Sequence, residues 1–142
     1  MPRRARLSVP GCVHHIMTRG LDGMNIFQDS DDREWFLTML GRQLRRTGVR
    51  CYAWVLMGNH YHLVVRASQQ PLSELMRPLN SGYARYYNRK VGRRGYLFQD
   101  RYKSVATQDQ GYTERLIRYV HLNPVRSGIC TGIGQLDIYP WC

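Results

Sequence analysis

The sequence has no hydrophobic run that approaches the roughly 20 residues needed for a membrane-spanning helix. Its first residues, MPRRAR, lack the apolar stretch of a secretory signal. We therefore expect a cytoplasmic protein with no membrane partner. Internal repeats, low-complexity tracts and linkers are also missing, and 142 residues are too few to form the hydrophobic cores of two ordinary domains. A single domain spanning residues 1–142 is predicted.

Cysteine is sparse and widely spaced. The four cysteines are Cys12, Cys51, Cys130 and Cys142, and no two of them form a Cys-x-x-Cys pair. This spacing disfavours a zinc finger or a dithiol redox site. In a reducing compartment we interpret Cys12 and Cys51 as small buried residues on strands.

Acidic residues are few, whereas basic residues are plentiful. Ten Asp and Glu stand against 21 Lys and Arg, which gives a formal charge of +11 and an isoelectric point near 10.0. This excess predicts a polyanionic partner. Nearly all the cations are arginine, which suits bidentate phosphate contacts and stacking on bases, so nucleic acid is favoured over a membrane surface. Charge alone does not separate DNA from RNA, and a merely soluble basic surface is the alternative.

Periodicity predicts a strand over residues 12–19, followed by a helix that Asp29 or Ser30 caps and Gly48 ends. Residues 50–56 and 60–66 read as an antiparallel pair of strands joined by a turn at 57–59. The first half of the chain therefore supplies three strands and one helix.

The second half begins with a helix that starts at Pro71. One or two short strands are expected within residues 96–107, before a third helix that Asp109 caps and Pro124 ends near Asn123. The order β-α-β-β-α-β with an added helix predicts the α+β class: a ferredoxin-like antiparallel sheet with helices on one face. The other face would be left for a functional site.

His60 and His62 form the strongest candidate site. They are two residues apart on a predicted strand, so both imidazoles point to the same face while Tyr61 points to the other. Two imidazoles on an open surface are able to hold part of a divalent cation site. The alternative is a pair of exposed histidines without a role.

Tyr119 and Asn123 are four residues apart on the last predicted helix and so project from the same side. The Asn123 carbonyl oxygen is a suitable ligand for Mg²⁺ or Mn²⁺, which accept mixed nitrogen and oxygen ligands. A phenol is a weak nucleophile at neutral pH, so Tyr119 would need such a cation or a base nearby to attack phosphorus. The alternative for Tyr119 is a core aromatic, because Leu116 and Val120 share its helix.

Two segments resemble a known family, the single-tyrosine transposases. Residues 56–65 (LMGNHYHLVV) resemble the HUH motif, in which a hydrophobic residue separates two histidines, and residues 118–128 (RYVHLNPVRSG) are similar to the tyrosine helix of REP-associated tyrosine transposases. Residues 9–15, 98–104 and 137–141 extend the resemblance over nearly the whole chain. These REP-associated proteins are domesticated relatives of small bacterial insertion-sequence transposases.

The resemblance implies an antiparallel sheet, a C-terminal catalytic helix, and a DNA nuclease and strand transferase that uses a 5′-phosphotyrosine intermediate. Tyr119 takes the catalytic position, and His60 and His62 take the metal positions, for Mg²⁺ or Mn²⁺. The amide that completes the metal site in related transposases is commonly Gln and corresponds here to Asn123.

The substrate that the resemblance implies is single-stranded DNA at or near hairpins of the repetitive extragenic palindrome (REP) kind. Basic and aromatic residues on strands and loops around the proposed face are the candidate DNA contacts. They are His14, His15, Arg19, Arg93, Arg94, Arg101, Tyr102 and Lys103. A catalytically silent DNA- or RNA-binding protein and a metal-dependent phosphodiesterase that uses water remain alternatives, and the sequence leaves monomer and homodimer equally open.

Overall fold

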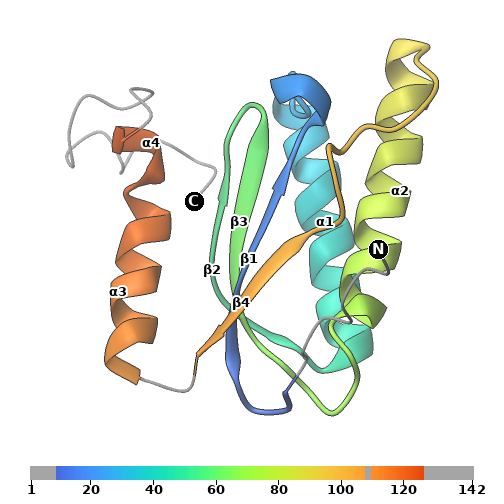
Figure 1. The fold of residues 1–142 in the computed structure, drawn as a ribbon. Coiled ribbons are helices and arrows are strands. Elements are labelled where there is room, and N and C mark those ends of the chain that lie inside the picture. Colours follow the sequence, from blue (N-terminus) through green and yellow to red (C-terminus); the bar gives the residue numbers. More distant parts are fainter. Residues whose placement is uncertain (1–8, 108–109, 127–142) are drawn as a thin grey trace, which may run out of the picture.

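Four antiparallel strands form one sheet in the order β2-β3-β1-β4 (Figure 1). The computed structural model describes residues 9–107 and 110–126. The strands are β1 (Val13–Arg19), β2 (Arg50–Leu56), β3 (His60–Arg66) and β4 (Lys103–Thr107). β2 and β3 have the bounds expected from the sequence. Segment 96–107 contributes β4 together with an isolated pairing of Phe98 with Gly20.

Two helices, α1 (Ser30–Thr47) and α2 (Ser73–Val91), cover one face of the sheet (Figure 1). The carboxylate of Asp29 accepts the backbone N–H of Asp32 at the start of α1, and Gly48 ends the helix with a left-handed φ of 75°. Nζ of Lys90 in α2 lies 2.6 Å from Oδ2 of Asp29 and 2.7 Å from Oδ1 of Asp32. These ion pairs connect the end of α2 to the start of α1.

The larger core lies between the sheet and these two helices. Alternation along β3 sends Tyr61, Leu63 and Val65 into it, and β1 contributes Ile16. From the helices come Phe36, Leu40, Leu75, Met76, Leu79 and Tyr83, all buried. The middle strands therefore have one fully packed face, which fixes the direction in which the alternate residues of β1 and β3 point.

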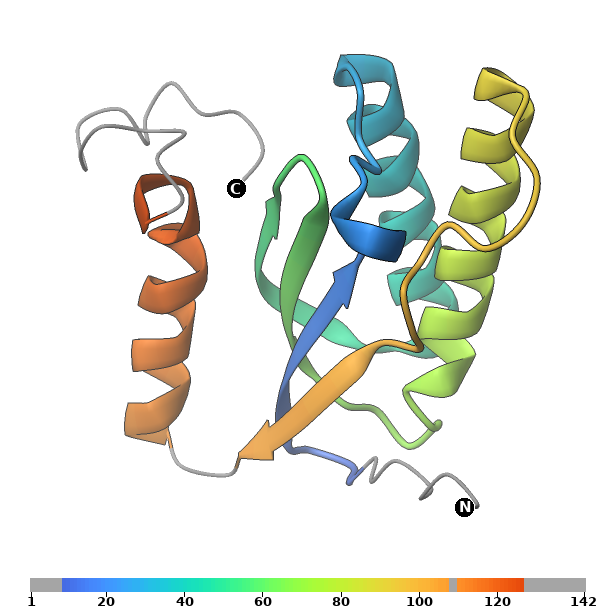
Figure 2. The same ribbon diagram turned by 45° about the horizontal axis from the view of Figure 1, so that its top comes forward.

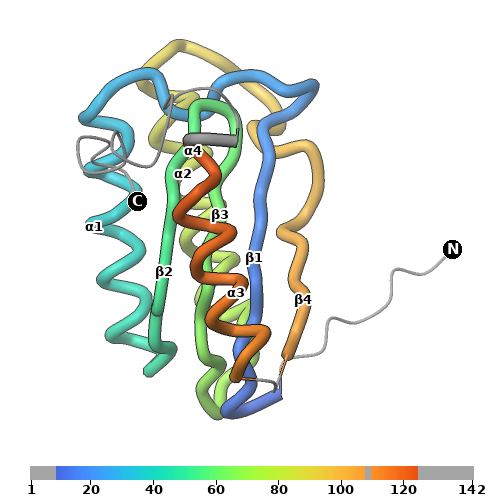
Figure 3. Tube along the Cα trace, turned by 90° about the vertical axis from the view of Figure 1, so that its left-hand side faces the viewer, coloured from blue at the N-terminus to red at the C-terminus, as the bar shows by residue number. Residues whose placement is uncertain are grey.

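A third helix, α3 (Gln110–His121), lies against the opposite face and is followed by a short helix, α4 (Asn123–Arg126). Figure 2 shows the sheet between α3 and the α1–α2 layer, and Figure 3 shows α3 running along the sheet. Leu116 and Val120 pack against Val55, Met57 and Val64 in a second, smaller core. The α+β fold with α1 and α2 on one face is confirmed, and α3 covers part of the face that we expected to be open. The Asp109 cap lies outside the described residues.

Two further expectations concern the cysteines and the membrane. Cys12 is buried just before β1, and burial raises the pKa of the half-buried Cys51 thiol to about 11, so neither thiol is poised to react. Cys130 and Cys142 lie outside the described residues. Among those described, no helix is long and apolar enough to cross a membrane.

Candidate functional site

The two histidines of β3 point to the face that α3 covers. In the register of the sheet His60 lies opposite Arg19 and His62 opposite Met17 of β1. The His62 side chain is only 3% exposed, and His60 is half-buried. Tyr61 points the other way, where its ring packs on Phe36 and its hydroxyl donates to the Asn80 side chain of α2. The polar tip of this ring is thus satisfied inside the core.

The side-chain amide of Asn123 lies against both histidines. Its Oδ1 is 3.3 Å from Nε2 of His60, and its Nδ2 is 3.3 Å from Nε2 of His62. Asn123 is the first residue of α4, directly after the turn in which the Leu122 N–H donates to the Arg118 carbonyl. The break between α3 and α4 therefore places the amide over the two Nε2 atoms.

The other ring nitrogens of the same histidines are held from behind. Nδ1 of His60 is 2.7 Å from Oδ1 of Asn59, and Nδ1 of His62 is 2.8 Å from Nε2 of His15 on β1. Each Nδ1 therefore contacts a protein side chain, and each Nε2 faces the space below Asn123.

Burial keeps these imidazoles neutral. It lowers the pKa of His62 to about 3, with further lowering by His15, His60 and the Arg19 guanidinium. Burial also lowers the pKa of His60 and of His15. Neutral imidazoles present a lone pair, which is the form that binds a metal cation.

At His60 and Asn123, two hydrogen-bond acceptors face each other with no proton between them, an arrangement that suits a cation. Oδ1 of Asn59 can only accept, because its Nδ2 is the atom directed at the Gly23 carbonyl, so Nδ1 of His60 carries the proton. Nε2 of His60 is then a lone pair that faces another lone pair, on Oδ1 of Asn123. A divalent ion between them would satisfy both. No cluster of three His, Cys, Asp or Glu side chains able to hold a metal occurs in the described part of the chain, so the third protein ligand would be this amide.

Tyr119 of α3 stands beside the histidines at the surface. Its ring is edge-on to His15, with centroids 6.2 Å apart, and to His62, with centroids 6.3 Å apart. The side chain is 41% exposed, whereas Leu116 and Val120 of the same helix are 6% and 0% exposed. Tyr119 is therefore not a core aromatic, and its side chain is accessible from solvent.

The structure divides the candidate DNA contacts between two regions. His15, Arg19 and Lys103 lie on the face of the histidines, where Lys103 and Arg19 are exposed. Arg93, Arg94 and Arg101 lie in the segment that joins α2 to β4. Arg94 and Arg101 are exposed there, and Arg93 donates to Asn88 across 3.2 Å.

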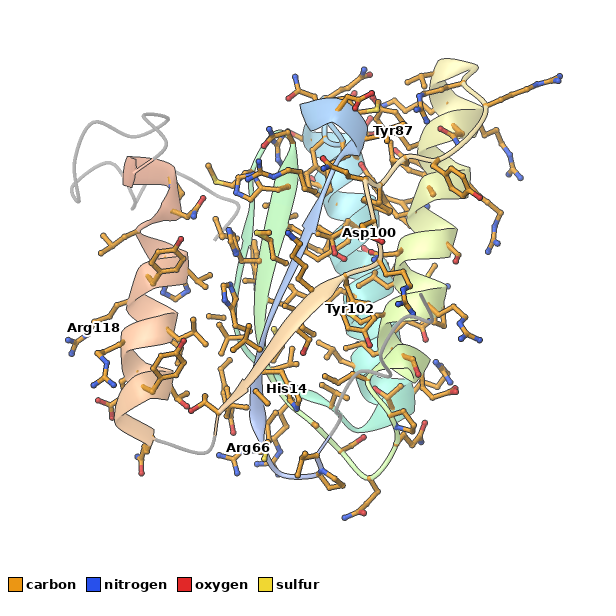
Figure 4. All side chains as sticks on the ribbon, viewed as in Figure 1. His14, Arg66, Tyr87, Asp100, Tyr102 and Arg118 are labelled. Carbon is orange, nitrogen blue, oxygen red and sulfur yellow. The ribbon has the colours of Figure 1, made fainter. Side chains whose placement is uncertain are left out.

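Two candidates do not lie where we expected them. His14 is fully buried on the α1–α2 side of the sheet, with Nδ1 3.1 Å from the Ser104 hydroxyl, because strand alternation turns it away from His15. Tyr102 is 8% exposed and belongs to the larger core near the start of β4 (Figure 4). Neither ring presents a face to bases in this structure.

The sequence pattern alone does not reveal that Asn59 and His15 contact the paired histidines. It predicts a turn at Asn59 and a DNA contact at His15. The signal for Asn59 was its position directly before the first histidine of the motif. The signal for His15 was its place on the strand that pairs with β3.

Solved structures with the same fold include transposases. A REP-associated tyrosine transposase bound to a REP hairpin has a TM-score of 0.78 at 15% identity, covering 99% of this chain and 81% of that one. A putative transposase from Deinococcus radiodurans has a TM-score of 0.56 at 16% identity, covering 84% of this chain and 95% of that one. No curated protein matches the sequence.

The model of one protein family matches most of the chain. That family is described as "Transposase IS200 like", and the match runs from residue 8 to residue 123. It spans the strands, the paired histidines, the helix that carries Tyr119 and the amide residue that faces the histidines. This chain therefore belongs to the IS200-like transposase family.

Proposed function

We propose that this transposase nicks and rejoins single-stranded DNA at or near REP-like hairpins, with Tyr119 as the nucleophile and a divalent metal ion on His60, His62 and Asn123. The observation that carries the proposal is the convergence of two Nε2 atoms and one amide oxygen beside an exposed tyrosine.

The donor set fits a hard divalent ion. The separation of 3.3 Å between Nε2 of His60 and Oδ1 of Asn123 is close to that of neighbouring ligands, roughly 3 Å, around an octahedral ion with bonds of about 2.1 Å. Two imidazoles and one amide leave coordination positions for phosphate oxygens and water. When bound, Mg²⁺ or Mn²⁺ would supply charge stabilisation at the scissile phosphate.

Tyr119 would carry the covalent step. Its hydroxyl oxygen attacks phosphorus and loses its proton to solvent, while the bond from phosphorus to the 3′-oxygen breaks and that oxygen takes up a proton. The protein remains on the 5′-phosphate, and the other fragment ends in a free 3′-hydroxyl. The phosphotyrosine bond conserves the energy of the phosphodiester, so attack by a 3′-hydroxyl reseals DNA without ATP.

Substrate binding would follow the basic surface. The solved relative is bound to a REP hairpin, and this chain has the same fold with a charge of +11. Arg19 and Lys103 flank the histidines, and Arg101 lines a groove of about 600 Å³ that also contains Arg77 and the 85% exposed ring of Tyr96. Guanidinium groups and an exposed aromatic ring suit phosphates and unpaired bases.

One denaturing gel tests this function against its alternatives. End-labelled hairpin DNA is incubated with the protein and Mn²⁺, and the products are separated after denaturation. We expect a covalent protein–DNA band. Free cut products without that band would indicate a hydrolase that uses water, and uncut DNA would indicate a binding protein.

Two variants serve as controls in the same gel. His60→Ala and His62→Ala remove one metal ligand each, so both are expected to abolish the Mn²⁺-dependent nick while leaving most of the salt-sensitive DNA binding. Full nicking by either variant would contradict the metal assignment.

A further inference from the structure

His15 and His62 are joined by a hydrogen bond in the plane of their rings. Nε2 of His15 and Nδ1 of His62 are 2.8 Å apart, the ring planes differ by 17°, and the centroids are 5.0 Å apart. The centroid separation exceeds the nitrogen separation by about two ring radii, so the two nitrogens lie on the line between the centroids. The rings therefore meet edge to edge and are not stacked face to face. One nitrogen must donate and the other must accept.

The role of His62 as a metal ligand sets the direction of this bond. Nε2 of His62 lies 3.3 Å from the Asn123 amide, on the side where His60 converges, so Nε2 must carry the lone pair that binds an ion. The ring proton of the neutral imidazole is then on Nδ1 and is donated to Nε2 of His15. In this tautomer the Nε2 lone pair of His62 is directed at the space where His60 and Asn123 converge.

Asn59 acts on His60 in the same manner. Its Oδ1 accepts from Nδ1 of His60, while its Nδ2 donates to the Gly23 carbonyl and so cannot exchange places with Oδ1 without losing that bond. Both site histidines are therefore held with Nδ1 protonated and Nε2 as a lone pair, by two different side chains.

We infer that His15 is a positioning residue that holds His62 in the Nδ1-protonated tautomer with Nε2 ready to bind the metal ion, and that it is not primarily a DNA contact. This inference deepens the proposed metal site and rests on it. Hydrogen-bonded partners of this kind fix the orientation of metal-binding histidines and raise their basicity. His15 is half-buried, and its ring also contacts the ring of Tyr119. The same side chain therefore touches both a proposed metal ligand and the proposed nucleophile.

The first readout needs no metal. Long-range ¹H–¹⁵N correlation spectra of the metal-free protein report the tautomer of each of its five histidines, and comparison with His62→Gln assigns His62. We expect His62 in the Nδ1-protonated form, although free neutral imidazole in water prefers the Nε2-protonated form. In His15→Leu, which removes the acceptor, a half-turn of the Asn123 amide brings Oδ1 opposite Nε2 of His62, so His62 should shift to the Nε2-protonated form.

The second readout is Mn²⁺ affinity measured by titration calorimetry. His15→Leu is expected to weaken Mn²⁺ binding roughly 10- to 100-fold. His15→Gln restores a hydrogen-bond acceptor, so its affinity should return to within a few-fold of wild type. His14→Leu is the matched control, because this neighbouring histidine is fully buried on the opposite face of β1. Backbone amide spectra of all three variants check that the fold is retained.

The outcomes separate this inference from the proposed function. His62 found in the Nε2-protonated form in the wild type, or unchanged Mn²⁺ affinity in His15→Leu, would overturn the role of His15 alone. Equal loss of affinity in His15→Gln and His15→Leu would overturn it as well, since accepting a hydrogen bond would then not matter. A wild type that binds no Mn²⁺ would overturn the metal site, whereas the tautomer spectrum would still decide what His15 does.

Discussion

His14 and His15 are adjacent on β1, and a difference of one position decides which of them faces the site. Adjacent histidines on a strand must point to opposite faces, so the sequence establishes that only one of them faces the site. It does not say which one, because both faces of β1 carry apolar residues, Ile16 on the face of His14 and Val13 on the face of His15. The choice follows from pairing with β3, which puts His15 beside His62 and sends His14 into contact with Ser104. The same-face placement of His60 and His62, in contrast, needs only the strand period.

A pH-dependent stability follows from the burial of these rings. In the metal-free protein the pKa of His62 is about 3, against an ordinary value of 6.5 in the unfolded chain. As pH falls below 6.5 the unfolded chain takes up a proton that folded His62 does not, so stability is full above this pH and is lost below it. Between pH 7 and pH 5 this loss is on the order of 2 kcal/mol.

Urea unfolding at the two pH values in the presence of a chelator measures this loss, with His62→Gln as the matched variant. The variant should lose about 2 kcal/mol less than the wild type over the same interval. An identical pH dependence of the two proteins would show that His62 is not held neutral by burial.

At the scale of elements, the segment between β1 and α1 supports the turn that carries the site. The N–H groups of Ile26 and Phe27 donate to the Gly58 carbonyl, and the Gly20 N–H donates to the Asn59 carbonyl. Gly20 has no room for a side chain, since an added Cβ would lie 2.3 Å from the Met24 carbonyl oxygen and 2.9 Å from Ile26. The positions of Asn59 and His60 therefore depend on this close approach.

Gly20→Ala is accordingly expected to destabilise the protein by about 1–3 kcal/mol and to weaken Mn²⁺ binding, because the turn must move. Gly41→Ala in α1 is the control. There the nearest atom to an added Cβ is the Arg45 guanidinium at 3.5 Å, so stability should hold or rise by up to about 1 kcal/mol. Chemical unfolding and Mn²⁺ titration measure both effects, and a Gly20→Ala protein as stable as Gly41→Ala would refute the argument.

Elements with strong local signals were predictable from the sequence. Asp29 and Gly48 mark the two ends of α1 through their own hydrogen bond and backbone conformation, and β2 and β3 follow from alternation around a short turn. β4 was harder to place, because it is a short and largely exposed edge strand with no buried face to pattern it. The start of α4 at Asn123 was also missed: a proline at position 124 is compatible both with ending a helix and with sitting in the first turn of another.

At the scale of the whole molecule, exposed basic residues lie on the histidine face, in the segment that follows α2, and on α1. Arg94 and Arg101 are exposed and belong to the surface that we propose for DNA, whereas Arg42 and Arg45 are exposed on α1. The two pairs carry the same charge, so they separate a specific DNA surface from a general effect of the net charge of +11.

Hairpin DNA affinity is expected to fall steeply with salt, because each neutralised phosphate releases counterions. Replacing Arg94 and Arg101 by Gln should reduce the slope of log affinity against log salt by about 2, while the same changes at Arg42 and Arg45 should leave it almost unaltered. Fluorescence anisotropy over a salt series measures the slopes. A flat response in the wild type, or equal slopes in the two double variants, would contradict the proposed DNA surface.

The central claim is that Tyr119 forms the covalent bond to DNA, and its most direct test is to locate the bond. Wild-type protein is incubated with hairpin DNA and Mn²⁺, digested with protease, and the DNA-linked peptide is identified by mass spectrometry. Tyr119→Phe keeps the ring near His15 and His62 and loses only the hydroxyl, so this variant should bind DNA, stay folded and form no adduct. We predict a 5′-phosphate on Tyr119 in the wild type; a link to another residue, or to a 3′-phosphate, would contradict the mechanism.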